Sequence, residues 1–372
     1  MQNEVTALEQ NKNVKVRDSG IELLRILMML QVIFLHVCLY GGYRSMTGNF
    51  SKLHRGAFNL VYLSSRCPVY VYILIFGYFA VTSNKTLGSI KGKILKTYLP
   101  MLFYSISIPF IGQLLGLWQL NDIQATRSFF PFLSKIWYFM TLYLIVLILS
   151  PFINKALTAL SKKDYTQLVI ILFLVFTVWT ALAQLKLTKT IIKLDNVIYP
   201  EGKSLYGFLL MYILGGYLRL HVPRHEKAKY RYFIFFIALT AINYLLCLLN
   251  ENYFSIATKN NNPFAVLQCL CLLMFFRDLK FKSRVINYIA SVNLGVYMIH
   301  EQYLVRNKLW HDWFGFLSEK SFYRSHLYHF KILMICVTVF IACGIIERLR
   351  VWLFKGVSIL YRKISSYKRQ YD

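Results

Sequence analysis

The stretch SGIELLRILMMLQVIFLHVC, residues 19–38, decides the fold of this chain. It is long and apolar enough to cross a bilayer as a helix, yet it carries Glu22 and Arg25 near its start and His36 near its end. Arg25 and His36 are eleven positions apart, which is about 16 Å along a helix and within ~20° of three full turns. Both side chains are therefore expected on one helix face. This pattern suits a functional site, but polar residues packed inside a helix bundle would also produce it.

The rest of the chain shares this apolar character. It has 372 residues, of which 57% are hydrophobic, and long apolar runs recur along most of its length. The expected fold class is all-α, a polytopic membrane helix bundle with about ten transmembrane helices. The ten predicted spans are roughly 21–40, 58–81, 96–117, 135–153, 166–185, 204–220, 232–250, 263–277, 286–304 and 329–349.

The net charge of +27 comes from basic residues in short loops between the apolar runs. Of the 43 Lys and Arg residues, 26 fall on the side of the N-terminus and 16 on the opposite side, and Arg25 lies within the first span. This bias predicts a multi-pass protein of the cell membrane with both termini in the cytoplasm. The predicted domain organisation is a cytoplasmic tail (1–18), a transmembrane domain (19–350) and a basic cytoplasmic tail (351–372). No polar stretch is long enough for a nucleic-acid-binding domain, so the lipid bilayer is the expected partner of this charge.

Motifs for metal or phosphate-loop chemistry do not occur in the sequence. The seven Cys residues lie mostly inside apolar runs without CxxC spacing, which indicates buried small side chains. The motifs GxSxG and HExxH are absent, as is a P-loop. We therefore expect no metal cofactor and no disulfide framework.

Two histidines, His36 and His300, lie well inside predicted spans. A His with a pKa near neutrality can accept a proton from a hydroxyl, and this general-base role is its commonest catalytic use. A hydrogen-bonded structural role in the bundle is the alternative for each. Glu301 follows His300 directly, so on a continuous helix the two side chains are expected to face different directions.

Lys93 and Lys96 occur where the third predicted span begins, on the cytoplasmic side. Being three positions apart, they share a helix face, and the free N–H groups of the helix start lie beside them. This arrangement suits a phosphate-bearing ligand. An ordinary interfacial anchor for the helix is the alternative.

Arg66 and Trp137 are two further polar or amphipathic residues near span ends. Arg66 lies a few residues into the second predicted span, on the outer side, where it needs a partner, a water-filled cavity or an interfacial position. Trp137 opens the fourth span together with Tyr138, a position typical of an aromatic belt at the membrane surface.

These residues resemble motifs of the acyltransferase 3 family of integral membrane proteins. Arg25 and His36 are similar to its first-helix signature, a basic residue and a His separated by ten residues. Lys93 and Lys96 stand where the family has RxxR, and Lys lacks the bidentate phosphate geometry of Arg. Further resemblance lies in Arg66-Cys67-Pro68 to Gly77-Tyr78, in Ile136-Trp137-Tyr138-Phe139 through Asn154, and in Gly295 through Glu301 with Arg306 and Trp310. The last stretch resembles the variant found in bacterial surface-polysaccharide O-acetyltransferases.

The resemblance implies transfer of an acyl group, usually acetyl from acetyl-CoA, to a hydroxyl of a surface polysaccharide or lipid-linked glycan. His36 would then be the general base or a transient acyl carrier. Arg25 would position the donor or orient a carboxylate such as Glu22, and Lys93 with Lys96 would hold the phosphates of acyl-CoA. On the acceptor side it implies the substrate-binding residues Arg66, Trp137, His300 and Glu301.

Two other functions fit the same pattern. Polar residues inside spans also mark the pathway of a transporter, so a glycan or small-molecule exporter of the same superfamily is the main alternative. A membrane anchor or assembly subunit without catalysis is the third possibility.

Overall fold

The computed structural model of the protein describes residues 17–42, 52–83, 85–185, 190, 202–250, 252–323 and 325–371. In these ranges the regular structure is helical and no strand occurs, which confirms the all-α prediction. Seven helical segments of the described chain are long and apolar enough to cross a membrane, and one of them, Arg55–Ala80, contains a short break. Helix α15 (Pro263–Arg277) is a shorter apolar helix.

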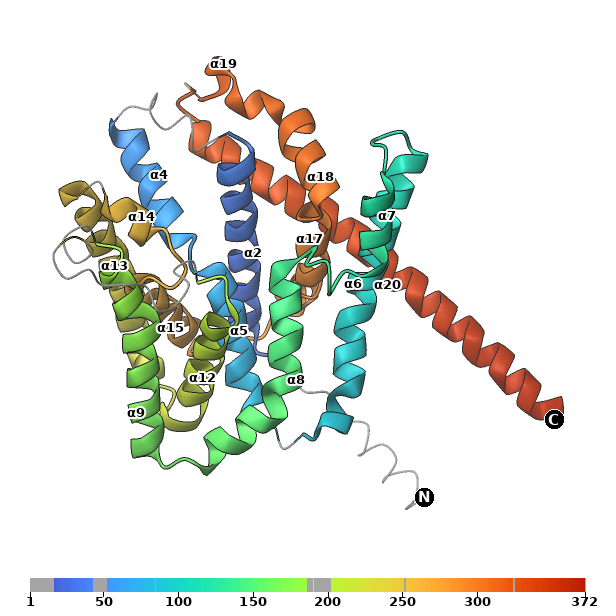
Figure 1. The fold of residues 1–372 in the computed structure, drawn as a ribbon, viewed down its shortest axis with the longest axis horizontal. Helices are drawn as coiled ribbons and strands as arrows, with labels where there is room; N and C mark the ends of the chain where they lie inside the picture. The colour runs from blue at the N-terminus through green and yellow to red at the C-terminus, as the bar shows by residue number, and fades with distance from the viewer. Residues whose placement is uncertain are drawn as a thin grey trace.

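Helix α2 (Ser19–Tyr40) stands in the middle of the bundle (Figure 1). It begins where the side chain of Asp18 accepts a hydrogen bond from the amide of Ile21. It contacts several neighbours, namely α5 (Pro68–Ala80), α15, α16 (Arg284–Ala290), α17 (Asn293–His300) and α20 (Tyr328–Tyr371). A helix contacted on several sides needs an apolar surface in most directions, which explains the nearly continuous apolar character of residues 19–38.

Helix α5 packs closely against α12 (Leu205–His221). A Cβ atom at Gly77 would lie 2.1 Å from the carbonyl oxygen of Tyr212, and one at Gly215 would lie 2.2 Å from that of Leu74. Small residues at such positions allow two helix backbones to approach closely, a common device in membrane bundles. The two glycines therefore set the spacing of this helix pair.

The remaining helices surround this centre. Helix α6 contacts both α7 and α8, and α13 contacts both α4 and α15. Helix α9 continues through a π-helical segment (Leu174–Trp179) to Leu182. Their bounds are α4 (Lys52–Ser64), α6 (Leu87–Leu114), α7 (Asp122–Phe129), α8 (Tyr138–Ala159), α9 (Lys162–Phe173), α13 (Lys229–Leu249), α14 (Tyr253–Ala257), α18 (Tyr303–Asn307) and α19 (Lys320–Tyr323).

Side-chain contacts join the start of α2 to two loops that were predicted on the same side of the membrane. Asp18 pairs with Arg224 at 3.0 Å. The hydroxyl of Ser19 accepts a hydrogen bond from the amide of Ser283 at 2.9 Å and donates one to the side chain of Asn287 at 3.1 Å. These three segments therefore meet at one end of the bundle.

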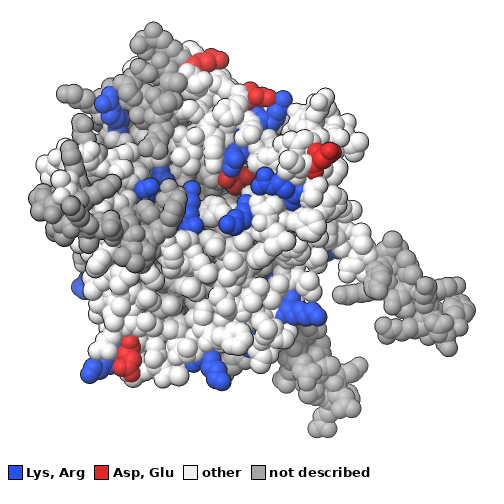
Figure 2. All heavy atoms as spheres, viewed as in Figure 1, with Lys and Arg blue, Asp and Glu red and all other residues white. Residues whose placement is uncertain are grey.

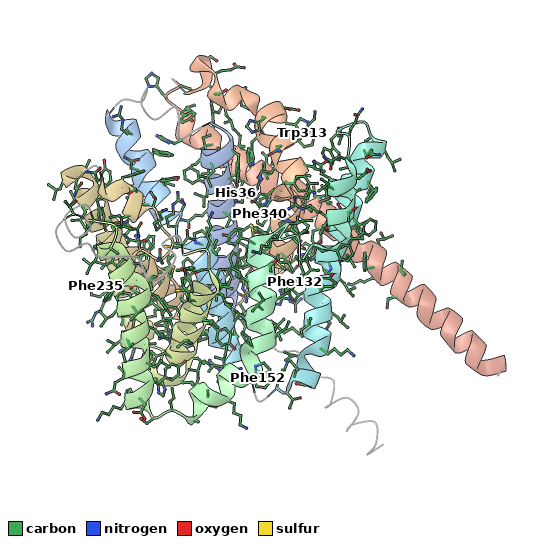
Figure 3. The ribbon with its side chains drawn as sticks, in the orientation of Figure 1. His36, Phe132, Phe152, Phe235, Trp313 and Phe340 are labelled. Carbon is green, nitrogen blue, oxygen red and sulfur yellow. The ribbon has the colours of Figure 1, made fainter. Side chains whose placement is uncertain are left out.

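Large apolar side chains cover the outside of the bundle. On α13, Ile234 is 65% exposed and Phe235 is 58% exposed, and on α8 Phe152 is 63% exposed. Figure 3 shows Phe235 and Phe152 at the periphery and His36 among the interior helices. Such surfaces are stable where lipid covers them, as in a membrane protein.

The predicted spans differ from the observed helices in several places. Helix α6 begins at Leu87 and not near residue 96, so Lys93 and Lys96 lie inside the helix and not beside the free N–H groups of its first turn. The predicted span 58–81 is two helices, α4 and α5, separated at residues 65–67. The predicted span 286–304 is likewise divided into α16, α17 and the start of α18. The last helix, α20, continues to Tyr371, so the segment predicted as a basic tail is helical. Local breaks were missed because the hydrophobicity of the chain continues across them.

Candidate active site

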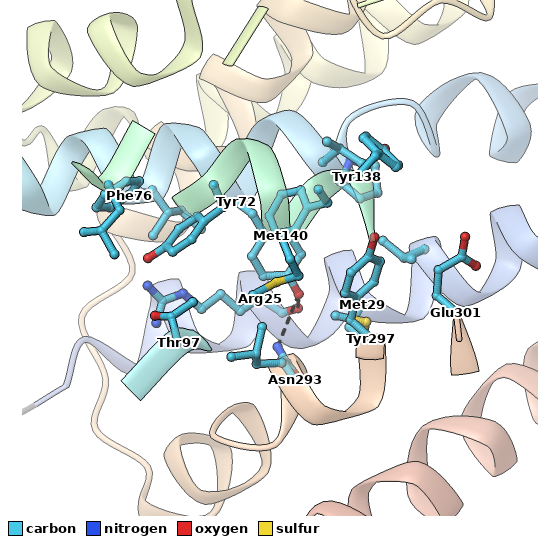
Figure 4. Close-up of a pocket in the computed structure, with 18 of the residues that line it drawn as sticks. Arg25, Met29, Tyr72, Phe76, Thr97, Tyr138, Met140, Asn293, Tyr297 and Glu301 are labelled. Carbon is cyan, nitrogen blue, oxygen red and sulfur yellow. Dashed lines mark hydrogen bonds between the residues drawn. The ribbon is translucent and has the colours of Figure 1, made fainter. Parts of the chain in front are cut away.

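A cavity of about 1120 Å³ runs along α2. Near the start of α2 its wall includes Glu22 and Arg25, and near the end it includes His36 and Tyr40. Figure 4 shows Phe76 and Thr97 at one end of the labelled lining and Glu301 at the other, with Arg25, Tyr72 and Tyr297 between them. The cavity therefore follows most of the length of a membrane-crossing helix.

His36 contacts two further ionisable side chains in the bundle interior. Its Nδ1 atom lies 3.0 Å from Nε2 of His300 and 3.2 Å from Oε2 of Glu301. His36 is 9% exposed and Glu301 is 8% exposed, while His300 is fully buried. Water screens these groups little, so their mutual interactions are strong.

The hydrogen bonds of His300 decide which nitrogen of His36 carries a proton. Nδ1 of His300 lies 2.5 Å from the carbonyl oxygen of Val296, one turn earlier in α17. Because a carbonyl only accepts, this Nδ1 is the protonated nitrogen, and Nε2 of a neutral His300 can only accept. Nδ1 of His36 is then the donor to His300. Nε2 of a neutral His36 is consequently unprotonated, and it is the ring nitrogen that remains for a substrate in the cavity.

Arg306 holds the carboxylate of Glu301 from its other side. Nη1 of Arg306 lies 3.0 Å from Oε1 of Glu301 and donates a hydrogen bond of 3.3 Å to the hydroxyl of Tyr40. The guanidinium also lies 4.4 Å from the centre of the Tyr40 ring. A carboxylate fixed next to an imidazole orients the ring and stabilises its protonated form. The group thus has the parts that a general-base histidine requires.

His300 and Glu301 approach the same nitrogen of His36, although adjacent residues of a continuous helix face different directions. Glu301 is the C-terminal cap of α17, and its amide still bonds to the carbonyl oxygen of Tyr297 as in a helix. The different directions expected of the two side chains therefore do not prevent both of them from reaching Nδ1 of His36.

At the opposite end of the cavity, Arg25 pairs with Glu22 at 2.9 Å. Lys93 lines the cavity there too, with its ammonium 4.6 Å from the centre of the Phe76 ring. Lys96 is exposed and does not belong to the cavity wall. Of the two lysines predicted to bind phosphate, the cavity therefore includes one.

Two more cations, Arg17 and Lys85, line the same end. Between the two ends, the hydroxyl of Tyr72 donates a hydrogen bond of 2.6 Å to the carbonyl oxygen of Arg25. The same hydroxyl accepts one of 3.3 Å from the side chain of Asn293. These two hydrogen bonds join α5 to α2 and to α17 in the wall of the cavity.

Arg66 and Trp137 stand behind the cavity wall. The guanidinium of Arg66 lies 4.2 Å from the centre of the Tyr62 ring, and the side chain is 7% exposed. Trp137 is 1% exposed. Neither residue lines the cavity, whereas Tyr138 and Phe139 do. His300 also stays behind the wall and reaches it through His36.

Sequence reasoning missed several cavity-lining residues. The position of Arg306, a cation five residues after Glu301, is the sequence signal that suggests this ion pair. Arg127, Lys135 and Lys203 lie at or between helix ends, where no periodic pattern marks them.

The part of the chain that the structure describes holds no group of three or more His, Cys, Asp or Glu side chains arranged to bind a metal ion. The cysteines in it are free thiols, and most are buried.

Comparison with known proteins yields one finding. Residues 18–354 match the model of the family Acyl_transf_3, described as an acyltransferase domain. No curated protein and no solved structure matches the chain significantly. The matched range includes every residue of the cavity wall except Arg17.

Proposed function

The chain belongs to the acyltransferase 3 family of membrane acyltransferases, and from this premise we propose that it moves an acetyl group from cytoplasmic acetyl-CoA to a hydroxyl of a surface polysaccharide or lipid-linked glycan. The observation that carries this proposal is the cavity along α2. It connects a cationic end, with Arg25 and Lys93, to the end where His36 lies. A donor entering from one side and an acceptor entering from the other would meet beside His36.

The donor would be bound at the start of α2. The phosphates of acetyl-CoA are anionic, and Arg17, Arg25, Lys85 and Lys93 line that end of the cavity. From Arg25 to His36 the helix rises by about 16 Å, a distance that the extended pantetheine arm of CoA would bridge. The ion pair with Glu22 would hold Arg25 in the orientation that faces the donor.

His36 would act as the general base. Its unprotonated Nε2 accepts the proton of the acceptor hydroxyl while the hydroxyl oxygen attacks the thioester carbonyl. The carbon–sulfur bond then breaks, and the thiolate of CoA leaves and takes the proton from the imidazolium. Glu301, 3.2 Å from Nδ1, would stabilise the imidazolium between these two steps.

The same nitrogen could instead carry the acetyl group for a moment. Nε2 would attack the thioester carbonyl, and the carbon–sulfur bond would break to release the thiolate of CoA. The acceptor hydroxyl would then attack the acetyl group, break its bond to Nε2 and give its proton to the thiolate. Rapid quenching of the protein with labelled acetyl-CoA and no acceptor separates the two routes. Label bound to the protein through His36 supports the carrier route, and its absence supports the general-base route.

The test of the function uses the purified protein in sealed lipid vesicles with acetyl-labelled CoA on the side of the α2 start and glycan on the other. We expect the amount of labelled acetyl groups on the glycan to equal the amount of CoA released. Glycan that crosses the membrane without gaining label would contradict acyl transfer and favour an exporter. Neither labelled nor transported glycan, across acceptors of different charge, would favour a subunit without catalysis.

A further inference from the structure

A second set of cations lines the cavity at the end near His36. Arg127, Lys135, Lys203 and Arg306 all belong to its wall, and we call them the outer basic cluster. Among the described lining residues of this end there are four cations and one carboxylate, Glu301, which is paired with Arg306. The described part of this wall therefore has more positive than negative side chains.

We propose that the outer basic cluster binds an anionic group of the acceptor, a carboxylate or a phosphate, so that the preferred acceptor is an acidic or phosphate-bearing glycan. This inference rests on the proposed function and specifies its acceptor. Cations in a partly enclosed cavity attract and orient anions more strongly than cations on an open surface. A neutral sugar would gain nothing from such a charge excess.

The backbone presents Lys135 in a conformation that has to be enforced. Its φ angle is 51°, in the left-handed region, which a residue with a side chain rarely adopts. Such conformations persist where surrounding structure imposes them, and they concentrate at functional sites. Here Arg127 and Ser134 impose it in part. The guanidinium of Arg127 donates a hydrogen bond of 3.2 Å to the carbonyl oxygen of Ser134. The hydroxyl of Ser134 donates one of 3.1 Å to the carbonyl oxygen of Arg127.

Lys203 is positioned by a separate set of contacts. Its ammonium lies 5.4 Å from the centre of the ring of Tyr138. Tyr138 follows Lys135 by three residues in the sequence. The preceding residue, Gly202, has a φ angle of 70° and accepts a hydrogen bond of 2.9 Å from the hydroxyl of Tyr70. The segments that contain Lys135 and Lys203 are distant in sequence, and both contribute a cation to the part of the cavity wall that includes Tyr138. Tyr138 could stack on the body of a sugar while the cations bind its charged group.

The outer basic cluster is separate from the cations that would bind acetyl-CoA. Those line the start of α2, whereas Arg306 contacts Tyr40 at its end. Figure 2 shows Lys and Arg side chains gathered around a hollow in the upper half of the molecule, away from the basic side chains along the lower edge. One cavity with two basic ends fits a reaction between two anionic substrates.

Binding without turnover tests the inference. The probes are an oligosaccharide of uronic acid units against its methyl ester, and geranyl diphosphate against geraniol, each titrated onto the protein in lipid nanodiscs. We expect each anionic probe that matches the acceptor to bind roughly tenfold more tightly than its neutral partner. Binding of the uronate alone would indicate a carboxylate acceptor, and binding of the diphosphate alone would indicate a phosphate-bearing one.

The variants assign the effect to the cluster. Arg127→Gln and Lys135→Asn should each weaken anion binding roughly tenfold, and Asn tolerates the left-handed backbone at position 135. Lys135→Arg keeps the charge and should bind like the wild type. Lys331→Gln, at the start of α20 and outside the cavity wall, is the control for loss of a distant charge.

Three outcomes would overturn the inference. The first is equal binding of anionic and neutral probes. The second is a preference for anionic probes that persists in the Arg127→Gln/Lys135→Asn double variant. The third is a preference for anionic probes that is lost in Lys93→Gln and not in the double variant, which would place the anion at the donor end. His36→Ala protein should still bind the anionic probe. A failure of acetyl transfer would therefore count against the proposed function but would not change the result of the binding test.

Discussion

Nδ1 of His36 lies 3.0 Å from Nε2 of His300, and the carbonyl of Val296 on the far side of His300 determines that His36 is the donor in this pair. This relationship leaves Nε2 of His36 unprotonated at the cavity. In the proposed mechanism His300, which does not line the cavity, would orient the ring of His36 without contacting a substrate.

Replacing His300 tests the orientation of His36 directly. His300→Leu removes the acceptor for Nδ1–H of His36, and we expect kcat to fall roughly tenfold, a part of the 10²–10⁴ that a general base contributes. His300→Gln keeps an acceptor in a similar position and should lose less activity. Steady-state kinetics of acetyl transfer measure both. Equal activity of the Leu variant and the wild type would show that Glu301 alone orients the ring.

Glu301→Gln keeps the size of the side chain and removes its charge. Because the carboxylate lies 3.2 Å from Nδ1 of His36, we expect kcat to fall roughly 10- to 100-fold with little change in KM for acetyl-CoA. The matched control is Asp312→Asn, which removes an exposed carboxylate paired with Lys308 outside this cavity. A rise in KM at constant kcat would instead mean that Glu301 serves in binding.

Lys93 and Lys96 share a helix face and a motif, yet the structure distinguishes them. Lys93 lines the cavity and Lys96 does not. Lys93→Gln should raise KM for acetyl-CoA by roughly threefold to tenfold, while Lys96→Gln should leave it unchanged. The kinetics are measured with acetyl-CoA as the varied substrate. Equal effects of both changes would argue that phosphate binds on the helix surface and outside the cavity.

The close packing of α5 on α12 predicts a stability effect. Gly77→Ala adds a methyl group 2.1 Å from the carbonyl oxygen of Tyr212 and should destabilise the protein by about 1–3 kcal/mol. Gly92→Ala, in α6, meets no atom within 4 Å and should be neutral or slightly stabilising. Unfolding in detergent by denaturant measures both. No loss of stability in the Gly77 variant would mean that the helix pair can separate without penalty.

Much of the architecture is readable from the sequence because lipid imposes long apolar segments on it. The predicted span 263–277 coincides with α15, and the predicted span 204–220 lies within one residue of α12. The breaks at residues 65–67 and after Ala290 are short, and an average of hydrophobicity over a membrane-length window does not resolve them. Pro68, the first residue of α5, is the local signal that marks the first break.

The site was predictable where a helix carries it and hidden where loops do. Arg25 and His36 were placed on one face of α2 by helical periodicity, and both line the cavity. His36 and His300 are 264 residues apart, so their contact depends on the packing of α17 against α2. Lys135 and Lys203 lie outside the helices and reach the cavity through backbone conformations that no sequence period encodes.

The rate of acetyl transfer by His36→Ala decides whether His36 is the catalytic group of the cavity. The assay measures label passing from acetyl-CoA to the acceptor glycan with purified protein in lipid. We expect a loss of roughly 10²- to 10⁴-fold relative to the wild type, while His311→Ala, which changes a histidine outside this cavity, should stay close to wild-type activity. Transfer by His36→Ala at the wild-type rate would contradict a catalytic role of His36.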